Sequence, residues 1–158
     1  MSQGNTQKDY AFVDCTYNQH ANLILDILND AILNSTALYD YKPRTYQAMR
    51  SWFKVKEEND FPVIGAVDDH GVLLGFASYG TFRAWPAYKY TVEHSVYVHK
   101  DHRGKGLGLQ LIATARKNQV HVLVGGIDIE NAGSVLMHEK LGFKHAGTIE
   151  QAAFKFGR

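Results

Sequence analysis

A glycine-rich turn in the second half of the chain is the segment best suited to bind a phosphorylated ligand. Residues Ser95–Val98 have the character of a strand, and Arg103-Gly104-Lys105-Gly106-Leu107-Gly108 follows and opens a helix. Glycines let the backbone approach a ligand closely, and the free amides and dipole of a helix N-terminus attract an anion such as pyrophosphate. Arg103 and Lys105 add positive charge. The competing interpretation is an ordinary tight turn whose basic residues are solvated.

A dinucleotide-binding fold is a second interpretation of the same turn. Its glycines are spaced G-x-G-x-G, whereas the dinucleotide fingerprint is G-x-G-x-x-G. Asp128 lies about twenty residues downstream, where that fingerprint places a ribose-binding acid. However, the turn comes late in the chain, and too few residues follow it to form the remaining parallel strands. The dinucleotide interpretation is therefore the weaker one.

Hydrophobic spacing predicts the elements that position this turn. Thr45 is suited to cap a helix, Gly142 to end one, and Asp68-Asp69-His70-Gly71 to join two strands as a hairpin. The order of elements predicts an α/β domain of the mixed α+β kind, with a partly antiparallel sheet. The predicted strands are 11–15, 61–67, 72–79, 90–99, 120–129 and 143–149, and the predicted helices are 20–33, 45–59, 104–118 and 132–141.

The composition limits the classes of function. The 158 residues fit one domain, which we expect to span 1–158 with a loose tail at about 1–8. Basic and acidic residues nearly cancel at a net charge of +1, which argues against binding nucleic acid or a membrane surface through bulk charge. No apolar run is long enough for a membrane span, and the polar N-terminus has no signal-peptide character. We therefore expect a cytoplasmic protein.

The residues around the turn resemble those of a known family. Arg103-x-x-Gly106-x-Gly108 is similar to the acetyl-CoA signature of the GNAT acetyltransferases. The similarity is stronger for the branch that acetylates phosphinothricin, methionine sulfoximine and methionine sulfone, and the run from Glu93 to Gly108 carries most of it. Further matches lie in Gly126-Ile127-Asp128, Asn131-Ala132, Ser134, His138–Phe143 and Phe154–Arg158.

This resemblance implies a GNAT-like fold that uses acetyl-CoA as co-substrate. In that fold a central, mostly antiparallel sheet is flanked by helices, and its fourth and fifth strands splay apart so that pantetheine lies between them. Asn131 and Ser134 would then contact the pantetheine arm, and Lys140 would lie near the nucleotide end. The other cofactor-binding residues that it implies are the strand backbone of Val96, Tyr97 and Val98, and the turn residues Arg103, Gly104, Lys105, Gly106, Leu107 and Gly108.

Acetyl transfer to an amine calls for a base and a proton donor. Only a neutral amine attacks a thioester, and a free α-amine has a reference pKa of about 8. Glu93 matches the family position that has the role of base; its alternative is a surface or paired carboxylate at a strand end. For the leaving thiolate, the resemblance implies His138, on a helix where many GNAT enzymes have a tyrosine. The alternative for His138 is a packed helix histidine.

The aromatic segment before Glu93 indicates where a substrate binds. Arg83 and Lys89 flank this segment, and either could pair with a substrate carboxylate, the arginine in bidentate fashion. The alternative is that these cations are solvated and the aromatic residues belong to the core. The candidate substrate-binding residues are Tyr39, Phe82, Arg83, Lys89 and Tyr90, with Trp85 as a further wall of the pocket.

The histidines and the single cysteine give no sign of other chemistry. None of the eight histidines has zincin spacing or a cysteine partner, so we predict no metal site. Cys15 has no recognisable base partner, and we predict a small, buried strand residue. As the only cysteine it forms no disulfide within the chain, which is compatible with a reducing cytoplasm.

The end of the chain departs from the resemblance. Relatives continue past Arg158 into another strand, so we expect the last strand of the sheet to be lacking and a sheet edge to be open. An open edge invites a second copy, which predicts a homodimer. The predicted function is acetyl-CoA-dependent N-acetylation of a small amino-acid-like amine by direct attack in a ternary complex. The alternative is an acyl-CoA-binding module without turnover.

Overall fold

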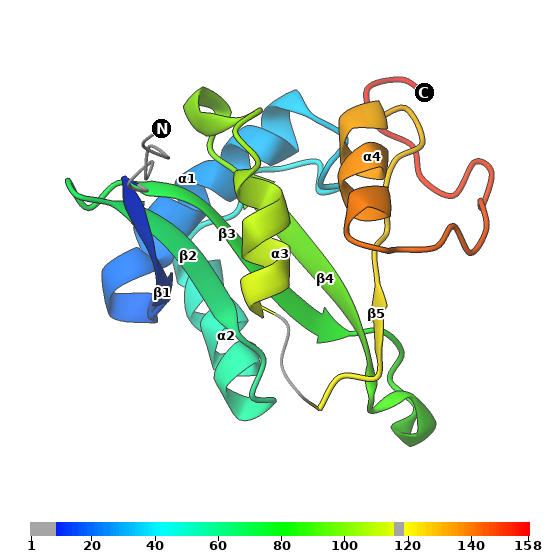
Figure 1. Cartoon of the computed structure of the whole chain (residues 1–158), viewed down its shortest axis with the longest axis horizontal. Helices are drawn as coiled ribbons and strands as arrows, with labels where there is room; N and C mark the ends of the chain where they lie inside the picture. The colour runs from blue at the N-terminus through cyan, green and yellow to red at the C-terminus, as the bar shows by residue number, and fades with distance from the viewer. Residues whose placement is uncertain (1–8, 116–118) are drawn as a thin grey trace, which may run out of the picture.

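In the computed structural model, residues 9–115 and 119–158 are described, and they form one sheet with helices on both faces (Figure 1). Helices α3 and α4 cover the face nearer the viewer, and α1 and α2 lie behind the sheet. In chain order the elements are β1 (Tyr10–Asp14), α1 (Tyr17–Asn34), α2 (Tyr46–Glu58), β2 (Val63–Asp68), β3 (Leu73–Thr81), the 3-10 turn η1 (Pro86–Tyr88), β4 (Thr91–Val98), the 3-10 turn η2 (Lys100–His102), α3 (Leu107–Ala115), β5 (Val122–Val124) and α4 (Ala132–Lys140).

The sheet has the strand order β1-β2-β3-β4-β5. Neighbouring strands are antiparallel from β1 to β4, and β5 joins β4 in parallel. The parallel pairing runs only from Thr91↔Val122 to Glu93↔Val124, although β4 continues to Val98. The fourth and fifth strands therefore separate after Glu93, which confirms the splayed pair that the resemblance implied.

Alternation along β4 sends its side chains to two different layers. Tyr97 packs against the core cluster of α1 and α2, whereas Val96 packs against the cluster that contains Leu107 of α3. Glu93 shares the face of Tyr97, and His94 shares the face of Val96. The two residues where β4 leaves β5 therefore point into opposite layers.

Side-chain caps fix where the helices begin. The Thr45 hydroxyl accepts a hydrogen bond from the Ala48 amide at the start of α2, as the sequence predicted. Thr16 caps α1 in the same way, and Asn131 caps α4 by accepting from the Ser134 amide at 3.2 Å. Of the helices that the structure describes, none is long and apolar enough to cross a membrane.

The predicted strand at 143–149 is wrong. The structure shows irregular backbone there, because within the described residues no neighbouring strand lies alongside to accept its hydrogen bonds. Phe143 instead donates its amide to the His138 carbonyl at 3.0 Å and places its ring against His94 and His138. Within the described residues, this segment therefore adds no strand beside β5.

Two further elements are shorter than predicted. The strand expected at 120–129 is limited to Val122–Val124, because β4 and β5 diverge at Gly125 and Gly126. The helix expected at 104–118 begins at Leu107, because Gly104 and Gly106 have φ values of 77° and 73°, which no α-helix accommodates. Residues 116–118, like the predicted tail at 1–8, lie outside the described residues.

Candidate active site

The point where β4 and β5 separate, which we call the ladder end, consists of Glu93, His94, Val124, Gly125 and Gly126. A methyl group on Gly126 would lie 3.2 Å from Glu93 Oε1, and one on Gly125 would lie 2.9 Å from His94 Cε1. The consecutive glycines thus make room on opposite faces of the sheet, one for a carboxylate and one for an imidazole. Two titratable groups approach the same few backbone atoms from two sides.

On one face of the ladder end, Glu93 is exposed and shares a layer with the Tyr97 side chain. Burial raises the pKa of Tyr97 to about 12; Arg44 opposes this rise, and the negative charges of Asp40 and Glu93 add to it. The Tyr97 hydroxyl is therefore protonated at neutral pH. An exposed carboxylate can accept a proton from an incoming amine, as the predicted base requires.

On the other face, His94 and His138 form a hydrogen-bonded pair, which we call the histidine pair. Their Nε2 atoms lie 2.8 Å apart. His94 Nδ1 lies 3.0 Å from the Val124 carbonyl, and His138 Nδ1 lies 2.6 Å from the Ser134 carbonyl. His138 is 4% exposed, so its Nε2 atom is hydrogen-bonded to His94 rather than to solvent. Both ring nitrogens of the predicted proton donor are thus engaged within the protein.

His94 is a site residue that the sequence analysis missed. It directly follows Glu93, and strand alternation places it on the face of α4, which carries His138. Burial is the largest cause that lowers the pKa of His94; the Val124 carbonyl opposes it, and the charge of His138 lowers it further. A second histidine beside the predicted base was the signal that could have identified this residue.

The glycine-rich turn lies at the far end of β4, before α3. Arg103 Nε donates to the Val98 carbonyl at 3.2 Å, and its guanidinium lies 3.4 Å from the Asp30 carboxylate of α1. Gly104 and Gly106 adopt positive φ values, and nothing lies within 4 Å of a methyl group built on either. The backbone here is therefore open for a ligand to approach, and the first amides of α3 face the same region.

Comparison with known proteins identifies this arrangement. The model of the Acetyltransferase (GNAT) family matches residues 25–143. The chain belongs to the GNAT acetyltransferase family. An L-methionine sulfoximine/L-methionine sulfone acetyltransferase of Pseudomonas aeruginosa is 43% identical over 139 residues, 85% of this chain and 81% of that protein. A phosphinothricin N-acetyltransferase of Streptomyces coelicolor is 30% identical over 141 residues, 85% of this chain and 82% of that protein.

Solved structures agree with this assignment. An acetyltransferase of Acinetobacter baylyi has a TM-score of 0.93 at 60% identity, covering 97% of this chain and 88% of that chain. An acetyltransferase of Salmonella typhimurium, solved with its cofactor acetyl-CoA, has a TM-score of 0.89 at 34% identity. The match covers 96% of this chain and 88% of that chain. The predicted GNAT fold and acyltransferase activity are confirmed, and no relative supports a module without turnover.

In this GNAT acetyltransferase the predicted cofactor residues occupy three places. Val96, Tyr97 and Val98 lie on β4 beyond the point where β5 leaves it. Lys105 is exposed in the turn, whereas Leu107 and Gly108 are buried at the start of α3. The α4 residues differ among themselves: the Asn131 side chain caps the helix, the Ser134 hydroxyl lies 3.4 Å from His138 Nδ1, and Lys140 is exposed in the last turn.

The predicted substrate residues fall into two separate groups. Tyr39 lies in the α1–α2 connection beside Asp128, whose charge adds to the burial that raises the pKa of the tyrosine. The other group lies in the β3–β4 connection, near the start of β4 (Figure 1). There Arg83 stacks on the Phe82 ring at 4.5 Å, and Lys89 on the Tyr90 ring at 4.8 Å. In Figure 1 the α1–α2 connection lies near α4 toward the top of the view and the β3–β4 connection lies at the bottom, so the two groups lie apart in one chain.

A buried lysine that sequence reasoning missed holds the α1–α2 connection in place. Lys155 is 5% exposed, and its Nζ donates to the carbonyls of Ile32, Ser35 and Leu38 at 2.6, 2.8 and 2.5 Å. These carbonyls end α1 and begin the connection that carries Tyr39. The C-terminal segment therefore fixes one wall of the candidate substrate site from more than a hundred residues away along the chain.

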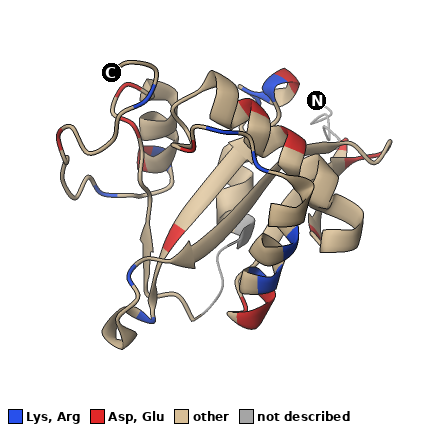
Figure 2. Cartoon of the chain, turned by 180° about the vertical axis from the view of Figure 1, so that it is seen from behind, with Lys and Arg blue, Asp and Glu red and all other residues tan. Residues whose placement is uncertain are grey.

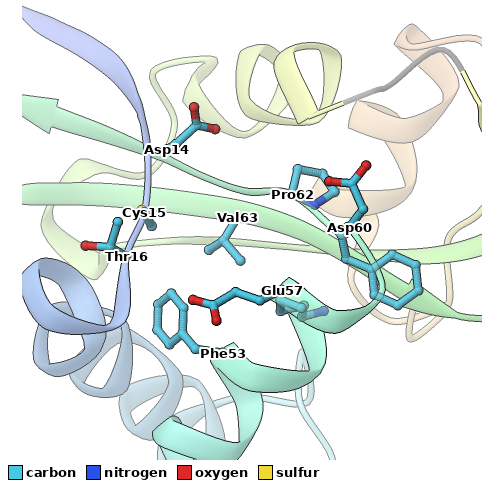
Figure 3. Close-up of a pocket in the computed structure, with 10 residues that line it drawn as sticks. Asp14, Cys15, Thr16, Phe53, Glu57, Asp60, Pro62 and Val63 are labelled. Atoms are coloured by element: carbon cyan, nitrogen blue, oxygen red, sulfur yellow. The ribbon is translucent and has the colours of Figure 1, made fainter.

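Two hollows accompany the site in the described part of the chain. One, of about 400 Å³, lies between the end of α1 and the start of α4 and includes Asn131. The other, of about 340 Å³, lies between β1 and α2 and contains none of the predicted site residues (Figure 3). Burial, and then Asp14, raises the pKa of Cys15 in this second hollow to about 12. The thiol is therefore protonated. The prediction of a buried strand residue is wrong in its details, because Cys15 directly follows β1 and is half-buried.

Charge and metal-binding groups complete the description. Seen from the α1 and α2 side, acidic and basic residues are interspersed, without a face of one sign (Figure 2). Among residues 9–115 and 119–158, no three histidine, cysteine or acidic side chains gather in a way that could hold a metal ion. The absence of a metal from the reaction stays a prediction.

Proposed function

We propose that this chain acts as one acetyltransferase domain over 1–158, transferring the acetyl group of acetyl-CoA to the α-amine of a small amino acid. The observation that carries the proposal is the ladder end, where the exposed Glu93 carboxylate lies beside the opening between β4 and β5. A direct transfer in a ternary complex fits, because the described nucleophile candidate Cys15 lies in a different hollow with its pKa raised to about 12.

The residues of this chain fit the binding of acetyl-CoA, which supplies the reactive thioester when bound. The backbone of Val96, Tyr97 and Val98 pairs with β3 and has no strand partner on its β5 side within the described sheet. The polar groups on that open side, apart from the Val98 carbonyl that accepts from Arg103, are therefore available to pantetheine. The open turn at Gly104–Gly108, with Lys105 beside it, fits the pyrophosphate. Arg103, held by Val98 and Asp30, orders the turn and adds charge to it.

Glu93 has the role of base in this proposal. It takes a proton from the substrate ammonium group, directly or through a water molecule, and the neutral amine then attacks the acetyl carbon. The amine nitrogen forms a bond to that carbon while the carbon–sulfur bond breaks, and CoA leaves as the thiolate with the electron pair. The nitrogen then gives up its second proton, which neutralises the thiolate directly or through water, and the neutral amide remains. The exposed carboxylate returns its proton to solvent for the next turnover.

The substrate class is methionine sulfoximine, methionine sulfone or phosphinothricin. Its support is the activities of the Pseudomonas aeruginosa and Streptomyces coelicolor relatives. Arg83 or Lys89 would pair with the substrate carboxylate, and Tyr39, Phe82 and Tyr90 would wall the pocket. Because these residues form two groups in one chain, we include a two-fold dimer in the proposal, in which a second copy brings the groups together.

Exposed apolar side chains support the dimer. Trp85, Tyr90, Val122 and Phe154 are all exposed, and β5 is an edge strand of the sheet. Large apolar side chains left exposed, together with an open sheet edge, are typical of interaction surfaces. Light scattering should give twice the chain mass; a fully active monomer would remove the dimer from the proposal. We also place the enzyme in the cytoplasm, where acetyl-CoA is available, and cell fractionation tests this location.

A substrate panel tests the activity itself. The full chain is mixed with acetyl-CoA and one amine at a time, and released CoA is detected with a thiol reagent. Methionine sulfone, methionine sulfoximine and phosphinothricin should each release CoA faster than methionine or lysine does. Binding of CoA without thiol release for any amine would refute the proposed function and favour the module without turnover.

A further inference from the structure

Four ring nitrogens and two backbone carbonyls form one continuous chain of contacts in the histidine pair. The Val124 carbonyl lies 3.0 Å from His94 Nδ1, the Nε2 atoms lie 2.8 Å apart, and the Ser134 carbonyl lies 2.6 Å from His138 Nδ1. A carbonyl oxygen only accepts hydrogen bonds, so each Nδ1 atom must carry a proton. Two neutral rings of this tautomer would leave two lone pairs facing each other between the Nε2 atoms.

We propose that His94 and His138 share one additional proton, so that the pair carries a single positive charge, with His94 as the positioning residue that fixes the orientation and protonation of His138. The proposal rests on the acetyltransferase function proposed above and deepens it. Three protons on four nitrogens satisfy every contact in the chain of hydrogen bonds. With two protons, two lone pairs would face each other between the Nε2 atoms, and with four protons, two N–H groups would face each other there.

The surroundings of the pair favour one charge over two. The Phe143 ring lies 5.3 Å from the His94 ring and 5.0 Å from the His138 ring, so the pair is packed against an aromatic face. Burial lowers the pKa of His94, the Val124 carbonyl opposes this, and the charge of His138 lowers it further. Once the pair holds one proton, its charge and its burial disfavour a second proton on His94.

Few other groups face the pair among the described residues. From β4 the nearest charge is the neighbouring Glu93, which points to the opposite face of the sheet. On α4 the neutral Ser134 hydroxyl lies 3.4 Å from His138 Nδ1. From β5 the groups are the Val124 carbonyl and the backbone of Gly125, and from the segment after α4 the Phe143 ring. The charge of the pair therefore depends on the two rings themselves.

A buried positive charge at the ladder end bears on acetyl transfer. As the thioester breaks, negative charge develops at the leaving group, and a fixed charge in a low-dielectric site stabilises it more than an exposed charge does. Both His138 nitrogens are engaged, so the pair acts through its charge and its fixed orientation while keeping its proton. This revises the predicted role of His138 as a donor to the sulfur.

Nuclear magnetic resonance of the ¹⁵N-labelled free enzyme measures the charge without any cofactor. At neutral pH both Nδ1 atoms should be protonated, and the two Nε2 atoms should resonate between the protonated and the unprotonated positions. His94→Phe should convert His138 to a neutral ring with a free Nε2. His70→Gln, in the exposed β2–β3 hairpin, is the control and should change neither ring. Two fully neutral rings, or two full imidazolium ions, would overturn the proposal.

Kinetics test whether the pair works as a unit. His94→Phe and His138→Phe should each lower kcat on the order of 10²-fold, with a smaller change in KM for acetyl-CoA. The double variant should be no slower than the slower single variant, because either change removes the shared proton. Losses that multiply, or a kcat pH profile unchanged in His94→Phe, would contradict the pair.

A conservative variant separates charge from packing. His94→Gln keeps a hydrogen-bonding partner for His138 Nε2 but cannot hold the shared proton. Its thermal midpoint should lie closer to the wild type than that of His94→Phe, while its kcat should stay low. Recovery of kcat in His94→Gln would show that packing alone matters. Since the resonance experiment needs no substrate, failure of the substrate panel would refute the proposed function and leave the shared proton to be judged separately.

Discussion

The ladder end and the hollow between β1 and α2 both bring titratable groups together, but only one arranges them for chemistry. In the hollow, Cys15 has a pKa raised to about 12, and burial lowers the pKa of Lys56 to about 8. The Lys56 ammonium donates to the Tyr79 carbonyl at 2.9 Å and lies 5.0 Å from the Trp52 ring. These contacts hold the lysine in the fold and leave the thiol without a base.

At the ladder end the groups are divided between two environments. Glu93 is exposed on one face of the sheet, while the histidine pair is buried on the other, with only Gly125 and Gly126 between them. An exposed carboxylate can pass protons to solvent, whereas a buried pair keeps its charge fixed. The comparison shows that a hollow lined by polar residues is a weaker indication of an active site than a strand with an exposed titratable group on one face and buried titratable groups on the other.

The largest effect that we expect comes from the exposed face. Glu93→Gln keeps the shape of the side chain but removes the proton acceptor, and general base catalysis contributes about 10²–10⁴-fold. We expect kcat/KM at neutral pH to fall by that order and to recover partly at high pH, where free amine accumulates. If the pH–rate profiles of variant and wild type overlay, Glu93 is a structural residue.

The next effect concerns the cofactor turn at the other end of β4. Gly106→Asp would place a carboxylate where pyrophosphate binds and would force a non-glycine residue to a φ of 73°. We expect micromolar CoA binding, equivalent to about −8 kcal/mol, to be lost in calorimetric titration. Gly71→Asp, in the β2–β3 hairpin at a φ of 78°, is the matched control, because it carries the same strain away from the site. Equal CoA affinity in both variants would remove the turn from the cofactor site.

The paired glycines allow the two faces to be perturbed one at a time. In Gly125→Ala the new methyl group would lie 2.9 Å from His94 Cε1 and 3.1 Å from His138 Cδ2, within a packed layer. In Gly126→Ala it would meet only the end of the flexible Glu93 side chain, at 3.2 Å. We expect Gly125→Ala to lose about 1–3 kcal/mol of stability in urea unfolding. Gly126→Ala should unfold nearly as the wild type does and lose activity only.

The decrease of folding stability at mildly acidic pH tests the same comparison. The pKa of His94 is lowered in the folded state by burial, so an unfolded histidine, with a pKa of about 6.5, binds its proton first as pH falls. On the singly charged pair this burial disfavours a second proton, so the stability that the pair provides is present above that value and is lost below it, by at most about 1.4 kcal/mol per pH unit for one proton. Urea midpoints between neutral and mildly acidic pH should fall less steeply in His94→Phe than in the wild type or His70→Gln.

The sequence was sufficient for the features that depend on local chemistry. Thr45 and the β2–β3 hairpin behave as their residue types require, and the resemblance supplied the separation of β4 from β5. His94 was missed because its role depends on α4 lying across the same face of the sheet, with His138 forty-four residues away. Pairing of that kind follows from packing and leaves no periodic signal along the chain.

The same reason explains the errors near the C-terminus. We predicted a strand at 143–149, yet a strand needs a neighbour, and Phe143 packs against the histidine rings instead. Lys155 reads as an exposed cation in the sequence, but the end of α1 supplies three carbonyls that bury it. Long-range partners decided both outcomes.

The smallest effect should come from the hollow itself. Burial raises the pKa of Cys15 to about 12, which keeps the thiol protonated at neutral pH, so a thiol reagent should react very slowly with the folded chain. In denaturant the single cysteine should react fully. Cys15→Ala should keep kcat/KM within about twofold of the wild type, because the substitution lies away from the ladder end and leaves the reacting groups in place. Its cost should show only in stability, because the Sγ atom packs where a methyl group on Gly65 would lie 2.6 Å away. A loss of activity in Cys15→Ala beyond its loss of stability would mean that this hollow takes part in the reaction, and the contrast with the ladder end would fail.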